Sequence, residues 1–72
     1  MNFSSALICL KEKISVYRDG WNGKGQYLTL QIPDENSKMT LPYIYFSTVE
    51  GKLVPWLASQ TDLLSEDWYE VV

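Results

Sequence analysis

The sequence predicts an α+β fold, with an N-terminal helix packed on a small antiparallel β-sheet of four to five short strands and a short helical turn before the last strand. Apolar residues recur at helical spacing in the first dozen positions. After them, short stretches of strand-forming residues alternate with glycine, proline or polar turns. The 72 residues contain no repeat, linker or low-complexity tract, so we expect a single domain over residues 1–72.

The first element is a helix over roughly residues 3–12. Its apolar side chains form one stripe, at i, i+3, i+4, i+7 and i+11, which comprises Phe3, Ala6, Leu7, Leu10 and Ile14. Asn2 is a suitable N-cap, with Ser4 or Ser5 as alternatives. The single cysteine, Cys9, lies beside this stripe and is expected to be a small buried apolar residue, because the sequence offers no base to activate it.

A β-hairpin is expected next. Residues 14–18 alternate β-branched and polar side chains, and residues 27–32 resume the alternation with leucine and isoleucine on one face. The loop between them, residues 19–25, contains three of the four glycines of the chain. The sequence therefore predicts two antiparallel strands joined by a long glycine-rich loop.

The third and fourth strands are expected at residues 41–46 and 53–56. The third carries apolar or aromatic side chains on both faces, and a chain of this length can hardly cover both, which indicates a partner subunit. Glu50-Gly51-Lys52 is a tight-turn signal between the two strands. Pro55 confines the fourth strand to an edge of the sheet or to the end of the strand.

The C-terminal part is expected to form one or two helical turns and a final strand. Ser59 and Asp62 have the spacing of a capping box, with serine at the N-cap and an acid three residues later. Residues 67–72 complete the sheet. Four carboxylates gather here, at Asp62, Glu66, Asp67 and Glu70. A cation site or an acid–base pair is one interpretation, and solvated acidic surface with helix capping by Asp62 is the better one.

Composition excludes several classes of function. The chain has no histidine and one cysteine, which excludes a histidine-based triad, a structural zinc cluster and an internal disulfide. The missing disulfide favours a reducing, cytosolic setting. With a net charge of −3 and scattered cations, duplex nucleic acid is not an expected partner. Lys11, Glu12 and Lys13 interrupt the only apolar N-terminal stretch, so no secretory signal is expected.

The glycine-rich loop is the strongest candidate for ligand binding. Glycines let a backbone approach a ligand closely, and successive N–H groups can form an anion-binding concavity. Trp21 would add a flat π-face for a purine or nicotinamide-like ring. Alternatively, Trp21 folds back as a lid on the core, and Asn22-Gly23 is simply a type I′ turn.

Two stretches carry a resemblance to a known family. Gly-Trp-Asn-Gly-Lys-Gly at residues 20–25, and residues 54–68 with the sequence VPWLASQTDLLSEDW, closely resemble the small phage and prophage family known as the second type of Thoeris anti-defence protein. The N-terminal helix is also similar, and the resemblance covers nearly the whole chain. Residues 33–41 are markedly shorter than the corresponding family insert, which contributes to pocket walls in longer members.

The resemblance implies a protein that is not an enzyme and needs no cofactor. Members of this family bind a cyclic ADP-ribose-type immune signal, made by bacterial TIR-domain proteins, and hold it away from its effector. Some relatives also take up cyclic dinucleotides, and one was first described as an anti-CRISPR protein. The resemblance further implies a homotetramer, built as a dimer of dimers with ligand pockets between subunits, that acts in the cytoplasm of the infected bacterial host cell.

By position, the resemblance also implies roles for individual residues. Trp21 would stack on a base, the loop that follows it would meet phosphate or ribose oxygens, and Lys24 or Arg18 would supply positive charge. The segment at residues 59–62 would hydrogen-bond a ribose or a base edge, although Ser59 and Asp62 can equally serve only as a capping box. Together, the implied ligand-binding residues are Arg18, Trp21, Asn22, Gly23, Lys24, Gly25, Ser59, Gln60, Thr61 and Asp62.

Two other functions remain open at the level of the sequence. The alternative from a different class is a protein–protein inhibitor of a bacterial defence nuclease or effector, as the anti-CRISPR relative suggests. A hydrolase of the same cyclic nucleotide is a third possibility, against which the absence of histidine counts heavily. Thermal stabilisation of the protein by nucleotides would distinguish sequestration from protein–protein inhibition. Mass spectrometry of the recovered nucleotide would distinguish sequestration from hydrolysis.

Overall fold

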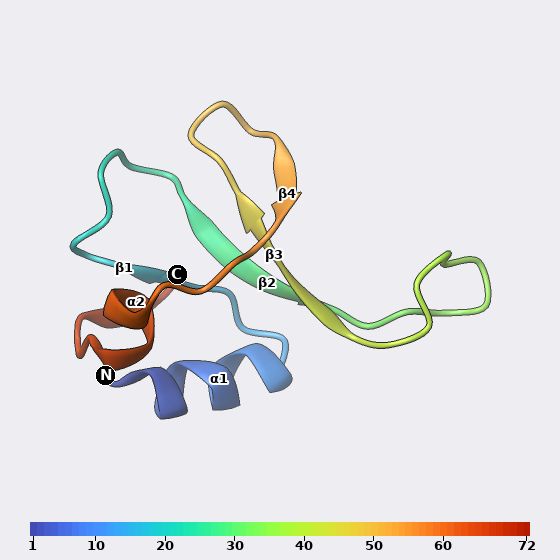
Figure 1. The fold of residues 1–72 in the computed structure, drawn as a ribbon, viewed down its shortest axis with the longest axis horizontal. Coiled ribbons are helices and arrows are strands. Elements are labelled where there is room, and N and C mark those ends of the chain that lie inside the picture. The colour runs from blue at the N-terminus through green and yellow to red at the C-terminus, as the bar shows by residue number, and fades with distance from the viewer.

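Five antiparallel strands form one sheet in the computed structural model, which describes residues 1–72 (Figure 1). Their order across the sheet is β4-β3-β2-β1-β5. The strands are β1 (Val16–Arg18), β2 (Tyr27–Gln31), β3 (Tyr43–Ser47), β4 (Leu53–Pro55) and β5 (Trp68–Glu70). With two helices beside this sheet, the structure confirms the predicted α+β fold.

Helix α1 spans Phe3–Lys11 and begins, as expected, at Asn2, whose side-chain oxygen accepts a hydrogen bond from the backbone N–H of Ser5 at 2.9 Å. Its buried face carries Ala6, Cys9 and Leu10. The helix packs under the β2-β1-β5 end of the sheet (Figure 1). The predicted helix is confirmed, and it ends one residue earlier than expected.

The core is small and lies between α1 and this end of the sheet. Three neighbouring strands each contribute one fully buried side chain, Leu28 from β2, Val16 from β1 and Trp68 from β5. The ring of Phe3 lies on that of Trp68, with centroids 5.3 Å apart. Only 8 of 72 residues are buried, so the opposite end of the sheet is held mainly by strand pairing and by partly buried side chains.

The far end of the sheet extends away from the helices. The connection between β2 and β3 protrudes from the body of the molecule (Figure 1). Strand β4 lies at the edge of the sheet, as Pro55 predicted, and all three of its residues are exposed. The turn before β4 is closed by a bond from the N–H of Gly51 to the carbonyl of Thr48 at 2.9 Å.

Helix α2 (Gln60–Leu64) begins with the predicted capping box. The N–H of Asp62 donates to the Ser59 hydroxyl at 3.0 Å, and the N–H of Ser59 donates to the Asp62 carboxylate at 3.1 Å. After α2 the chain enters β5, which pairs with β1 in antiparallel register. Neither helix has the length and apolar character that crossing a bilayer requires.

Candidate functional site

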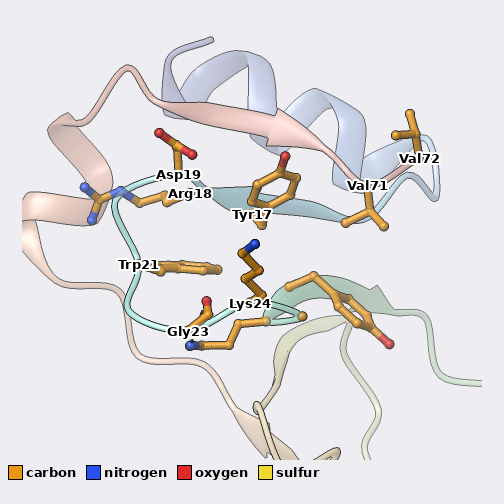
Figure 2. Close-up of a pocket in the computed structure, with 11 residues that line it drawn as sticks. Tyr17, Arg18, Asp19, Trp21, Gly23, Lys24, Val71 and Val72 are labelled. Atoms are coloured by element: carbon orange, nitrogen blue, oxygen red, sulfur yellow. Dashed lines mark hydrogen bonds between the residues drawn. The ribbon is translucent and has the colours of Figure 1, made fainter.

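The glycine-rich loop and the C-terminal residues enclose a cavity of about 610 Å³ between them (Figure 2). This volume lies in the range typical of small-molecule sites. The cavity combines three aromatic side chains with glycine backbone, a few charges and two valines; its lining comprises Tyr17, Trp21, Tyr27, Gly23, Gly25, Gln26, Arg18, Asp19, Lys24, Val71 and Val72.

Trp21 belongs both to the cavity and to the outer layer of the core. Its half-buried ring meets Phe46 and Trp68 edge-on, with centroids 5.2 and 5.4 Å away. Its indole N–H donates to the Asp62 carboxylate at 3.1 Å. Figure 2 shows the ring directed into the cavity, toward Lys24. Trp21 thus packs on the core, as one interpretation of the sequence had it, and also lines the cavity. Its stacking on a ligand stays a prediction.

An ion cluster lies behind Trp21. The Arg18 guanidinium bonds the Asp62 carboxylate through Nη1 at 2.8 Å and the Asp67 carboxylate through Nε at 2.9 Å. The second oxygen of Asp67 accepts the backbone N–H of Gly20 at 2.8 Å. Arg18 and Asp62 each expose about a tenth of their side chains, 12% and 11%. Figure 2 shows the Arg18 guanidinium pointing away from the cavity, so its charge is used within the chain.

The cluster fixes the charges of its members. Burial raises the pKa of Asp62, but hydrogen bonds from Arg18, from the Ser59 backbone and from Trp21 outweigh this effect and hold the pKa below its ordinary value. The Arg18 hydrogen bond lowers the pKa of Asp67 against a smaller opposing effect of burial. Bonds to Asp67 and then to Asp62 raise the pKa of Arg18. Both carboxylates therefore stay ionised at neutral pH.

Lys24 is the cation that remains available to a ligand. It is exposed, makes no ion pair, and its side chain points into the cavity in Figure 2. Asp19 also lines the cavity, is exposed and makes no ion pair. An anionic group in this cavity would therefore meet Lys24, whereas the Arg18 guanidinium is already shared between two carboxylates.

The loop needs glycine at two lining positions. Gly23 and Gly25 have φ of +88° and +84°, a region that residues with a Cβ rarely adopt. A Cβ at Gly23 would also come within 2.9 Å of Gln26 and Val49. The Gln26 side-chain amide donates to the carbonyl of Asn22 and so closes the loop on itself. At Gly23 and Gly25 the loop therefore presents backbone, without a side chain, to the cavity.

The structure brings together only part of the predicted ligand-binding set. Arg18, Trp21, Gly23, Lys24 and Gly25 line the cavity beside the glycine-rich loop. The others lie elsewhere, in two groups. Asn22 faces a smaller hollow of about 320 Å³ on the side of β4, and residues 59–62 form the start of α2 and line neither space.

Sequence reasoning missed six lining residues, of which Asp19 and Gln26 lie at the two ends of the glycine-rich loop. Tyr17 and Tyr27 flank the loop, so the predicted strand pairing could have placed them beside it. Val71 and Val72 reach the cavity because β5 pairs with β1, which brings the C-terminus back to the hairpin. No local pattern signals that pairing. Cys9, by contrast, lies in the core as predicted, where burial and a hydrogen bond to Glu70 raise the pKa of its thiol.

Comparison with known proteins gives the family. The chain matches the Thoeris anti-defense 2-like domain over residues 1–71. It belongs to the Thoeris anti-defense 2-like family. It is also 37% identical over 81 residues to Thoeris anti-defense 2 of Bacillus phage SP01, a match that covers 94% of this chain and 91% of the phage protein. The resemblance seen in the sequence is confirmed, and membership of the Thoeris anti-defense 2-like family assigns the chain an anti-defence role in phage infection.

Proposed function

We propose that this family member binds a cyclic ADP-ribose-type immune signal, or a related cyclic dinucleotide, and sequesters it uncleaved in the cytoplasm of the infected bacterium. One observation carries the proposal: a single cavity joins an aromatic face on Trp21, open glycine backbone and the unpaired Lys24. A nucleotide has a part to match each of these: a base that can stack on the indole, ribose hydroxyls that can hydrogen-bond to the backbone, and negatively charged phosphates that can pair with the lysine.

The aromatic wall would hold a base. Tyr17, Trp21 and Tyr27 all reach the cavity, and one stacked base contributes about 1–3 kcal/mol. Phosphate oxygens would meet Lys24 and the N–H groups of the loop at Gly23–Gly25, where the absence of side chains permits close approach. The asymmetric lining would thus orient a ligand that has a base at one end and phosphates at the other.

The paired acids and the thiol outside this cavity support sequestration over cleavage. Hydrolysis needs a group that can take up or release a proton near neutral pH. The pKa values of Asp62 and Asp67 are lowered by Arg18 and their oxygens are used within the chain. Cys9 is in the core with a raised pKa and does not line the cavity. The chain contains no histidine.

Tight sequestration would also need more contacts than one subunit offers. Nanomolar affinity corresponds to about −12 kcal/mol, and a stacked base supplies only a small part of it. We therefore propose that the site is completed by further copies of the chain, arranged as a homotetramer. The accessible surface is 5406 Å², whereas a compact monomer of this mass would expose about 4600 Å². The chain therefore exposes about 800 Å² more than a compact monomer would.

Exposed apolar side chains are available for such contacts. Seven of them expose more than 60% of their surface: Met39, Leu41, Val49, Leu53, Leu57, Leu64 and Val72. Three of them, Met39, Leu41 and Leu53, line one hollow of the surface, and exposed apolar side chains that gather in one patch are typical of a protein–protein interaction site. Native mass spectrometry at micromolar concentration should therefore give a tetramer, and a monomer at that concentration would contradict the assembly.

The binding experiment is a thermal-stability panel with cyclic ADP-ribose, linear ADP-ribose and cyclic dinucleotides. A nucleotide at about 100 times its Kd stabilises the folded state by about 2.7 kcal/mol, which for a domain of this size raises Tm by about 10–20 °C. Mass spectrometry of the nucleotide recovered after denaturation should return its original mass. A cleaved product would refute sequestration, and a panel without any shift would refute nucleotide binding.

A further inference from the structure

We infer, taking the proposed function as given, that Asp62 and Arg18 are positioning residues, which hold the Trp21 indole and the glycine loop in place and make no contact with the nucleotide themselves. Both were expected from the sequence to touch the ligand. Their placement behind Trp21, each with about a tenth of the side chain exposed, assigns them this different role.

Asp62 ties Trp21 to three other parts of the chain. One carboxylate oxygen, Oδ1, accepts from the Trp21 indole N–H at 3.1 Å and from the Arg18 guanidinium at 2.8 Å. The other, Oδ2, accepts the N–H of Ser59 in the capping box. The Asp62 carbonyl accepts the indole N–H of Trp68 in the core at 3.0 Å. The start of α2 therefore fixes the position of the indole N–H of Trp21.

Arg18 ties the same cluster to the first residues of the loop. Its Nε bonds Asp67, and the second oxygen of Asp67 accepts the N–H of Gly20, the residue directly before Trp21. The N–H of Asp19 donates to the Asp67 carbonyl at 3.0 Å. The backbone before Trp21 and the edge of its ring are thus held by one set of charges. The atoms of the cluster that face Trp21 and Gly20 are thus used within the chain.

An Asp62→Asn variant separates these roles by chemistry. An amide has one acceptor oxygen and two N–H donors, so it cannot accept at once from Ser59 on one side and from Trp21 and Arg18 on the other. With the oxygen toward Ser59, the NH₂ group faces the Trp21 N–H, donor against donor. With the oxygen toward Trp21 and Arg18, the bonds lose the carboxylate charge that strengthens them, and the NH₂ group faces the Ser59 N–H. In both orientations the hold on the Trp21 indole is weakened.

Ser59→Ala is the matched control. It removes the hydroxyl that accepts the Asp62 N–H, and so weakens the same capping box. The bonds of the Asp62 carboxylate to Trp21 and Arg18 do not involve that hydroxyl. Loss of helix capping alone is therefore common to both variants, whereas release of Trp21 is specific to Asp62→Asn.

Solvent exchange of the indole N–H groups, followed by ¹⁵N NMR without any nucleotide, reports the result. Trp21→Phe assigns the Trp21 signal, and the Trp68 N–H, bonded to a backbone carbonyl, is the internal reference for folding. Exchange at Trp21 should be faster by at least about tenfold in Asp62→Asn and unchanged in Ser59→Ala. Equal exchange rates in Asp62→Asn and the wild type would overturn the inference.

A less disruptive variant keeps the test decisive if Asp62→Asn does not fold. Lysine in place of Arg18 keeps the charge but has no planar fork to bridge two carboxylates. Arg18→Lys should accelerate exchange of the Gly20 amide by at least about threefold, since Asp67 is no longer fixed. An unchanged rate at Gly20 would count against the role assigned to Arg18.

Titration with cyclic ADP-ribose then connects the cluster to binding. Asp62→Asn should raise its Kd by at least about tenfold, and Ser59→Ala should leave it unchanged. In a Trp21→Phe background, Asp62→Asn should cause a smaller further loss, because the bond from the Trp21 N–H to Asp62 is already gone. An equal loss in both backgrounds would show that Asp62 does not act on binding through Trp21 and would contradict this part of the inference. If the wild type does not bind cyclic ADP-ribose, the titration contradicts the proposed function. The exchange rates, measured without nucleotide, still test the positioning role of Asp62 and Arg18.

Discussion

Replacing Trp21 with alanine tests the site and the core together, because this one side chain belongs to both. A fully buried tryptophan replaced by alanine costs about 3–5 kcal/mol, so the half-buried Trp21 should cost about 2 kcal/mol. Loss of the hydrogen bond to Asp62 adds about 1 kcal/mol, since Arg18 still satisfies that carboxylate. The expected total is about 3 kcal/mol. A domain of this size is stable by about 4–11 kcal/mol, so the variant should still fold.

Urea denaturation followed by circular dichroism measures this cost. With a slope of about 1 kcal/mol per molar urea for a domain of this size, the midpoint should fall by about 3 M in Trp21→Ala. Trp21→Phe is the matched control, because it keeps a ring against Phe46 and Trp68 and removes only the N–H. It should lower the midpoint by about 1 M.

The same two variants separate packing from binding. Trp21→Ala should weaken binding of cyclic ADP-ribose at least about tenfold, at a temperature where the variant is fully folded. A midpoint of Trp21→Ala within about 0.5 M of the wild type would refute the packing of this ring on the core. Undiminished affinity in a folded Trp21→Ala protein would refute its role as the stacking surface.

Three further predictions concern the charges and glycines of the site. The pKa values of Asp62 and Asp67 are lower in the folded state than their ordinary value of 3.8. The two ionised carboxylates therefore stabilise the fold fully above pH 3.8, and this stabilisation is lost as the pH falls through the lower pKa values of the folded state. Urea midpoints should therefore be constant from about pH 7 to 5 and fall below about pH 4; constancy down to about pH 2 would contradict the cluster. Lys24→Ala should change stability by less than about 0.5 kcal/mol but weaken cyclic ADP-ribose binding several-fold, and should reduce its salt dependence in calorimetry. Gly25→Ala should cost about 1 kcal/mol from its positive φ alone, and Gly23→Ala about 2–3 kcal/mol because the new Cβ also meets neighbours at 2.9 Å; equal urea midpoints for the two would contradict this loop geometry.

The local elements and the family could be determined from the sequence. Helical spacing and an asparagine N-cap predict α1, and the Ser59–Asp62 spacing predicts the capping box. Pro55 predicts that β4 lies at an edge of the sheet or ends at this proline. The structure confirms all three predictions. These features depend on residues a few positions apart, for which backbone geometry leaves few alternatives. The glycine-rich loop was identified for the same reason, because its composition is itself the signal.

Only the tertiary structure decided which side chains meet. Pairing of β5 with β1 brings Asp67 to Arg18 and the C-terminal valines to the loop, across nearly fifty residues of chain. Asp62, which the sequence allowed either to touch a ligand or to cap a helix, is turned inward by the same packing. Long-range pairing is selected by the free energy of the whole fold rather than by any local pattern. Residue types and loop composition therefore indicate the candidate site, and the fold decides which of its charges line the cavity and which are paired within the chain.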